Sequence, residues 1–211
     1  MKMLRILLPL LAIAATSARA VNVIVDFDAL NSGDPANNDA AVTGFSFSYG
    51  VLEPLLDSFG VPIPGSDHWV TDIPSGSATV SDTALAGYGA APTGTLALDA
   101  TPQPVLLTFS GPVDLTSFAV TLDNSPFGFD GFNAEFYGAG DVLLGSVPVI
   151  QSSPGYLVSA SGLSGVSYLM LPSGAMYDHF VMNYAPVPEP GSALLMLGAL
   201  VPLARRRRPG C

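Results

Sequence analysis

Residues 133–149 read NAEFYGAGDVLLGSVPV, and they predict a β-hairpin. Residues 133–137 form the first expected strand, the Gly-Ala-Gly-Asp segment at 138–141 forms a hairpin-type turn, and residues 142–149 form the returning strand. Glycine and aspartate are the residues that turns favour. This stretch indicates an all-β fold that is built from neighbouring antiparallel strands.

The same pattern of short apolar runs and turn residues recurs from residue 21 to residue 186. Phe45, Phe47 and Tyr49 alternate with serines, and residues 177–184 form the last expected strand. Separate strands are expected at 105–109 and 118–122, and a helical turn is expected over 52–59. About ten or eleven strands favour a two-sheet, jelly-roll-like β-sandwich over residues 21–186.

The charged residues are distributed very unevenly along the chain. All seven basic residues lie in the first 19 residues or in the last seven, whereas 16 of the 17 acidic residues lie between residues 21 and 188. A domain without Lys or Arg lacks the cationic contacts to phosphates that nucleic-acid binding requires. Its carboxylates need solvent, backbone N–H groups or a hard cation such as Ca²⁺ as partners.

The N-terminus has the features of a secretory signal peptide. Lys2 and Arg5 precede an apolar run, and Ala18-Arg19-Ala20 is a small-x-small cleavage site, so the mature chain is expected to begin at Val21. We therefore expect residues 1–20 to form a signal helix that directs export through the Sec translocon.

The C-terminus combines a rigid step, an apolar run and a basic cluster. The rigid step consists of Val187, Pro188, Glu189 and Pro190, the apolar run covers residues 191–204, and the cluster consists of Arg205, Arg206, Arg207 and Arg208. As a helix the apolar run is about 21 Å long, which is marginal against a hydrocarbon core of about 30 Å. The arginines would place the C-terminal end of this helix in the cytoplasm. A plain C-terminal membrane anchor is the alternative interpretation.

These residues resemble the PEP-CTERM sorting signal of Gram-negative bacteria, over residues 187–208. The resemblance implies export across the inner membrane, cleavage near Pro-Glu-Pro by an exosortase, and a cell-surface or extracellular product associated with polysaccharide and biofilm. Pro202, inside the apolar run, is a departure from this pattern, because proline disfavours a straight helix.

The middle of the chain is more weakly similar to the β-sandwich ectodomains that precede this signal. The similarity is carried by Phe27-Asp-Ala-Leu30, by residues 134–146 and by Tyr177-Asp-His-Phe180. It implies that the first and last strands lie side by side and that Asp28 and Asp178 hold a structural Ca²⁺. His179 stands where the second of two aspartates is usual, and two hydrogen-bonded carboxylates are the alternative.

Other candidate residues carry weaker signals. Two oxygen-rich groups are more typical of solvated loops than of Ca²⁺ loops: Asp34, Asn37, Asn38 and Asp39, and then Asp123, Asn124 and Asp130. His68 and His179 are the only histidines and match no catalytic motif. Trp69 and Tyr88 could stack on sugar rings, although Trp69 is expected more often in a core.

Three functions remain open from the sequence. The first is an exported surface or matrix protein whose acidic domain binds carbohydrate, and we expect this one, without enzymatic activity. The second is an inert acidic spacer. The third is a carboxylate-dependent glycoside hydrolase, which needs two carboxyl groups about 5–10 Å apart in one site.

Overall fold

The computed structural model describes residues 19–71, 77–83, 94, 96–124, 132–151 and 155–187. Ala20 and Val187 lie inside these ranges. Ala18, the Pro-Glu-Pro step at 188–190, the apolar run and the arginines at 205–208 lie outside them, so the expected terminal helices do as well. Within the described ranges, no helix has the length and apolar content needed to cross a bilayer.

The expected all-β class is confirmed: the described residues contain ten strands and one short 3-10 helix, η1 (Ala36–Asn38). The strands are β1 (Val21–Val25), β2 (Phe45–Glu53), β3 (His68–Thr71), β4 (Val80–Asp82), β5 (Leu96–Asp99), β6 (Val105–Asn124), β7 (Phe132–Tyr137), β8 (Leu143–Val149), β9 (Leu157–Leu171) and β10 (Met176–Pro186).

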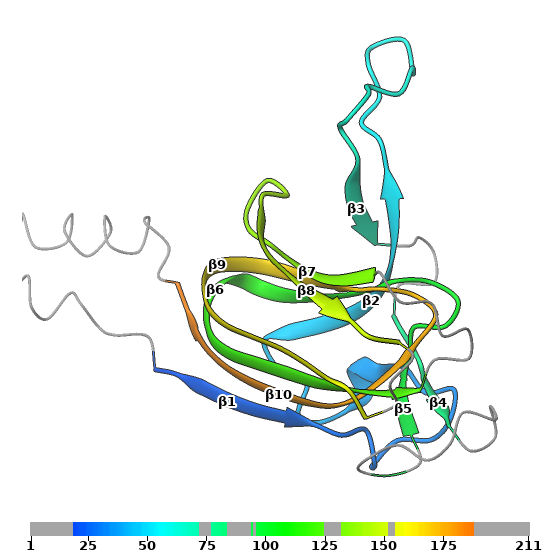
Figure 1. Cartoon of the computed structure of the whole chain (residues 1–211), viewed down its shortest axis with the longest axis vertical. Coiled ribbons are helices and arrows are strands. Elements are labelled where there is room, and N and C mark those ends of the chain that lie inside the picture. Colours follow the sequence, from blue (N-terminus) through cyan, green and yellow to red (C-terminus); the bar gives the residue numbers. More distant parts are fainter. Residues whose placement is uncertain are drawn as a thin grey trace, which may run out of the picture.

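Hydrogen bonds join these strands into one antiparallel sheet. Its main order is β4-β5-β10-β6-β9-β7-β8, while β1 pairs with β10, β2 with β6, and β3 with β2. The long strands β6, β9 and β10 run together through the middle of the molecule (Figure 1). Val25 lies opposite Phe180, so the expectation that the first and last strands are neighbours is confirmed.

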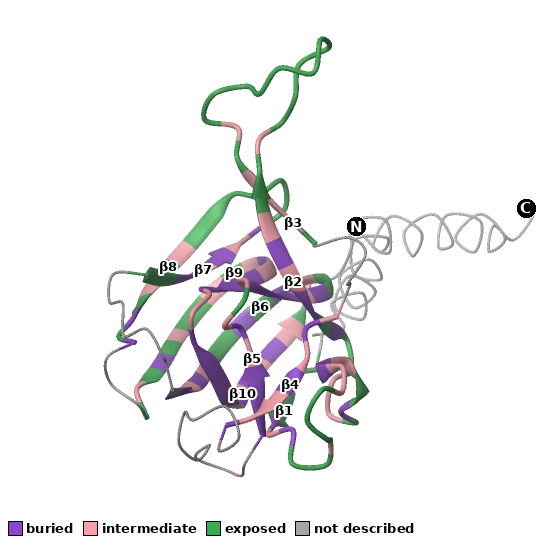
Figure 2. Cartoon of the chain, turned by 90° about the vertical axis from the view of Figure 1, so that its right-hand side faces the viewer, coloured by how far each residue is buried: buried purple, intermediate pink, exposed green. Residues whose placement is uncertain are grey.

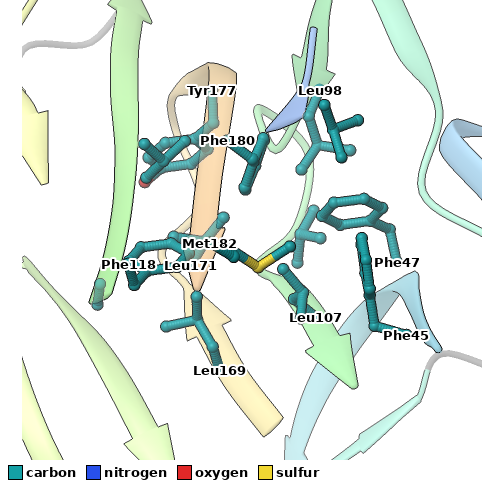
Figure 3. Close-up of a cluster of buried hydrophobic side chains, with 14 of the residues drawn as sticks. Phe45, Phe47, Leu98, Leu107, Phe118, Leu169, Leu171, Tyr177, Phe180 and Met182 are labelled. Atoms are coloured by element: carbon teal, nitrogen blue, oxygen red, sulfur yellow. The ribbon is translucent and has the colours of Figure 1, made fainter. Parts of the chain in front are cut away.

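Buried aromatic side chains form the centre of the core. Phe27, Phe47 and Phe180 are fully buried and meet edge to face, with ring centroids 5.1–5.9 Å apart. Figure 3 shows Phe45 and Phe47 facing Phe180, Met182 and Leu171 across the interior. The predicted apolar face of the last strand is confirmed, because Phe180, Met182 and Tyr184 are all buried.

Phe27 adopts a backbone conformation that is rare for a bulky residue. Its φ angle is +58°, in the left-handed region. Such a conformation costs about 1–3 kcal/mol. Complete burial of a phenylalanine side chain returns about 1.5–3 kcal/mol, and its two edge-to-face ring pairs add to this. The core contacts therefore hold the chain in this turn after β1.

Strand β6 is longer than the pattern predicts. The two strands expected at 105–109 and 118–122 belong to one strand of 20 residues. The Gly111-Pro112 break does not end the strand, because Pro112 lies at an irregularity in the pairing with β9, where a sheet tolerates proline. The irregularity is instead absorbed as a register shift against β9 between Thr108 and Val113. Pro112 still contributes its carbonyl, which accepts a hydrogen bond from the Val187 N–H at 2.9 Å.

A two-stranded arm projects from the sheet (Figure 1). It consists of residues 50–71, in which Leu52 pairs with Trp69 and Glu53 with His68. The prediction of a helical turn over 52–59 is wrong, because residues 52 and 53 continue β2. Pro54, which follows, cannot donate a backbone hydrogen bond to a helix. The Asp57 carboxylate instead accepts hydrogen bonds from the N–H groups of Phe59 and Val61 at 2.8 and 2.9 Å.

Most side chains between Leu52 and Ile63 are exposed, as Figure 2 shows along the projecting loop. Phe59 at the tip is 89 % exposed. The arm is therefore ordered by backbone hydrogen bonds and turn chemistry rather than by an apolar core.

Candidate functional site

Three aromatic side chains from distant parts of the sequence lie together at the base of the arm. Tyr137 on β7 lies opposite Tyr168 on β9, and their rings stack with centroids 4.9 Å apart and planes 14° from parallel. Trp69 on β3 donates a hydrogen bond from Nε1 to the Tyr137 hydroxyl at 3.3 Å. The three side chains are only partly buried.

Strand alternation explains why these rings point away from the core. On β7, Ala134 and Phe136 are buried, and Tyr137 takes the opposite side of the strand. On β9, Leu169 is buried and the adjacent Tyr168 faces outward with Tyr137. The register of β7 against β9 then brings the two tyrosines opposite each other.

Two carboxylates accompany the rings. The Tyr137 hydroxyl donates a hydrogen bond to Glu135, which is on the same side of β7. The Tyr168 hydroxyl donates to Asp141 at 2.9 Å. Asp141 reaches this position from the turn after β7, where its φ angle is +59°. Trp69, Tyr137, Tyr168, Glu135 and Asp141 together are called the aromatic face below.

The tyrosine hydroxyls of the aromatic face are held in their protonated form. Burial first, and then the hydrogen bond to Glu135, raise the pKa of Tyr137 to about 12. Burial first, and then the hydrogen bond to Asp141, also raise the pKa of Tyr168. Both phenols therefore remain hydrogen-bond donors to carboxylates at neutral pH.

The chemistry available at the aromatic face is flat apolar ring surface bordered by hydrogen-bond acceptors. A carboxylate has two oxygens and about four acceptor positions, and each tyrosine hydroxyl uses one of them. The remaining positions can accept from hydroxyl or amino groups of a ligand. A sugar ring, with an apolar C–H side and polar substituents, matches both features.

Among the sugar-stacking candidates of the sequence, Trp69 lies in this face and Tyr88 lies outside the described residues. The expectation of Trp69 in the core is wrong, since it is partly exposed on β3. Tyr137 and Tyr168 were not among the predicted site residues. The sequence does hold a signal for them. Each tyrosine is next to a core residue, Phe136 or Leu169, in an expected strand, so alternation places its ring on the outer side of the sheet.

The predicted cation pair occupies two different environments. Asp178 on β10 is fully buried, and its Oδ1 accepts a hydrogen bond from the His179 N–H at 2.7 Å. Asp28 is exposed beyond the end of β1, with its carboxylate against Gly94, where an added Cβ would lie 1.8 Å from Oδ1. His179 adopts a positive φ angle of +52° beside Asp178.

These two carboxylates supply few of the six to eight oxygen ligands that Ca²⁺ takes. No group of three or more His, Cys, Asp or Glu side chains suited to a metal occurs among the residues that the structure describes. Calcium binding at Asp28 and Asp178 therefore stays a prediction. A chelator that lowers the melting temperature beyond the effect of ionic strength would support it.

Asp34 and Asp39 of the first oxygen-rich group stabilise local turns. Asp34 accepts hydrogen bonds from the backbone N–H and the side chain of Asn31, and Asp39 accepts one from the Ala41 N–H. Asp123 is not in a solvated loop as expected, because it is buried near the end of β6. The side chain of Asn124, and Asp130, lie outside the described residues.

Comparisons of the chain with protein-family models, with curated proteins and with solved structures found no match. The aromatic face and the sequence features of the two termini are therefore the features that point to a function.

Proposed function

We propose that the domain binds carbohydrate through the aromatic face. The observation that carries this proposal is the stacked pair Tyr137–Tyr168 beside Trp69, with a carboxylate hydrogen-bonded to each tyrosine. Stacking on a partly exposed aromatic ring buries the C–H side of a sugar, and the carboxylates accept hydrogen bonds from its hydroxyl groups. The rings come from three strands that already hold them in place, so little side-chain entropy is lost on binding.

The proposal includes the location of the protein. The N-terminal signal pattern and the PEP-CTERM-like tail support export across the inner membrane and sorting to the cell surface, with cleavage near Pro188 by an exosortase. A polysaccharide outside the cell would then be the natural ligand. We further propose that the continuous sheet folds over its aromatic core as a jelly-roll-like sandwich, which is supported by burial on the inward sides of β2, β6, β9 and β10.

Polysaccharide binding is tested by isothermal titration calorimetry and by pull-down with native exopolysaccharide, using the mature domain. We expect Trp69→Ala to weaken binding at least tenfold, because a stacking surface is lost. Phe59→Ala is the matched control, since it removes another exposed aromatic ring, at the tip of the arm. Equal losses in both variants would contradict a site at the aromatic face.

The same experiment separates the alternative functions. No binding to any polysaccharide would favour an inert acidic spacer. Release of new reducing ends during incubation would favour a glycoside hydrolase. Mass spectrometry of the extracellular protein tests the sorting proposal separately: we expect a C-terminus between residues 188 and 191, and an intact arginine tail would contradict cleavage.

A further inference from the structure

The charge of the domain restricts which polysaccharides it attracts. Sixteen carboxylates and no Lys or Arg lie between residues 21 and 188. A polymer of uronic acids or sulfated sugars would meet an excess of like charges and no Lys or Arg side chain. Such a ligand is therefore disfavoured, whereas a polymer with positive charges is attracted over a Debye length of about 10 Å in 0.1 M salt.

The aromatic face adds short-range groups that favour a cation. Glu135 and Asp141 each use one acceptor position for a tyrosine hydroxyl and keep the others. The rings of Trp69, Tyr137 and Tyr168 present π-electron density, which attracts an ammonium group by about 0.5–2 kcal/mol. An ammonium has three donors for the carboxylate oxygens. Neutral hydroxyl groups gain neither the charge nor the π attraction.

We propose that the ligand of the aromatic face is a polysaccharide of amino sugars with free, protonated amines. This inference rests on the proposed carbohydrate-binding function and specifies its ligand class. The sugar ring stacks on the aromatic side chains while the ammonium group contacts Glu135 or Asp141. N-acetylation of the amine removes its positive charge, so the acetylated polymer keeps the stacking contact and loses the ionic one.

The test measures the affinity of the mature domain for four hexasaccharides by titration calorimetry at pH 5.5 and low salt. The probes are hexamers of glucosamine, N-acetylglucosamine, glucose and galacturonic acid. We expect the glucosamine hexamer to bind at least tenfold more tightly than its acetylated form, and this preference to decrease as salt is added. Equal binding of the two, or tighter binding of the galacturonate hexamer, would overturn the inference.

Variants distinguish a specific site from general attraction to an acidic protein. Glu135→Gln and Asp141→Asn keep an oxygen for the tyrosine hydroxyl, and asparagine tolerates the left-handed backbone at 141. Each should weaken binding of the glucosamine hexamer by a larger factor than binding of the glucose hexamer, so that the preference for glucosamine falls at least threefold. Asp114→Asn is the control, because Asp114 is an exposed carboxylate that accepts a hydrogen bond from the Gly165 N–H outside the aromatic face.

The outcomes also separate this inference from the proposed function. If Asp114→Asn reduces the preference as much as the two face variants do, the attraction is non-specific and the inference is wrong. If the neutral hexamers bind and Trp69→Ala abolishes this binding without any preference for glucosamine, carbohydrate binding stands and the amino-sugar specificity fails. If none of the hexamers binds, the amino-sugar inference is wrong, and the pull-down with native exopolysaccharide decides separately whether carbohydrate binding stands.

Discussion

The side chain of Asn37 forms two hydrogen bonds with the backbone of Phe47. Its Oδ1 accepts from the Phe47 N–H at 2.7 Å, and its Nδ2 donates to the Phe47 carbonyl at 2.9 Å. The carboxamide thus pairs with β2 as a neighbouring strand would. Because an unpaired strand edge invites association with other chains, Asn37 protects this position and fixes the loop before β2 against the core.

Replacing Asn37 with alanine should destabilise the domain by about 1–3 kcal/mol, because the Phe47 N–H loses its partner and the Phe47 carbonyl keeps only the longer hydrogen bond from the Ala78 N–H, at 3.4 Å. Urea unfolding followed by circular dichroism measures this change. Asn38→Ala is the control, since Asn38 is exposed in the same short helix, and it should change stability by less than about 0.5 kcal/mol. Similar effects for both variants would contradict the role of Asn37.

The aromatic core predicts a large contrast between two phenylalanines. Phe180 is fully buried against Phe27 and Phe47, whereas Phe59 is almost completely exposed at the tip of the arm. Phe180→Ala should cost about 3–5 kcal/mol through lost contacts and a cavity. Phe59→Ala should cost less than about 0.5 kcal/mol. A large loss at Phe59 in the urea experiment would show that the arm tip packs against the domain in solution.

Local sequence signals predicted much of the fold. The hairpin over 133–149 appears as β7 and β8 within one or two residues of the expected bounds, because a short turn with glycines determines it locally. The last strand could also be predicted locally, since its alternating apolar residues are the ones that are buried. The pairing of β1 with β10 was expected only from the resemblance to β-sandwich ectodomains, because no local pattern specifies which distant strand becomes a neighbour.

The candidate site could be predicted only in part for the same reason. Trp69 was found by its residue type, but its contact with Tyr137 spans 68 positions in the sequence. The stack of Tyr137 on Tyr168 depends on the register of β7 against β9. β8 lies between these two paired strands in the sequence, so their register is not a local property of either strand. Long-range register, rather than composition, therefore assembles the aromatic face.

The phenol of Tyr137 should ionise at unusually high pH. Its pKa is about 12 because of burial and then the hydrogen bond to Glu135, against 10.0 for the free side chain. A group with a raised folded pKa contributes stability that is complete below pH 10 and is lost as the pH rises through about 12. The difference in tyrosinate absorbance between the native protein and Tyr137→Phe should show one phenol titrating near pH 12. The same difference in urea should titrate near pH 10, and a native transition near pH 10 would contradict the buried hydrogen bond.

Asp123 should make the stability of the domain increase as the pH falls below neutrality. Burial first, and then the negative charge of Asp178, raise the pKa of Asp123 from 3.8 to about 6. Because the folded state holds the proton more tightly, this contribution is complete below about pH 4 and is lost as the pH rises through about 6. The rise of the Asp123 pKa from 3.8 to about 6 corresponds to about 3 kcal/mol, and we expect about half of this contribution after solvent screening. Asp123→Asn should remove this part of the pH dependence between pH 4 and 7 in urea unfolding, while Asp114→Asn, at an exposed carboxylate, should retain it. Identical pH profiles for the wild type and Asp123→Asn would show that Asp123 is not the group that titrates.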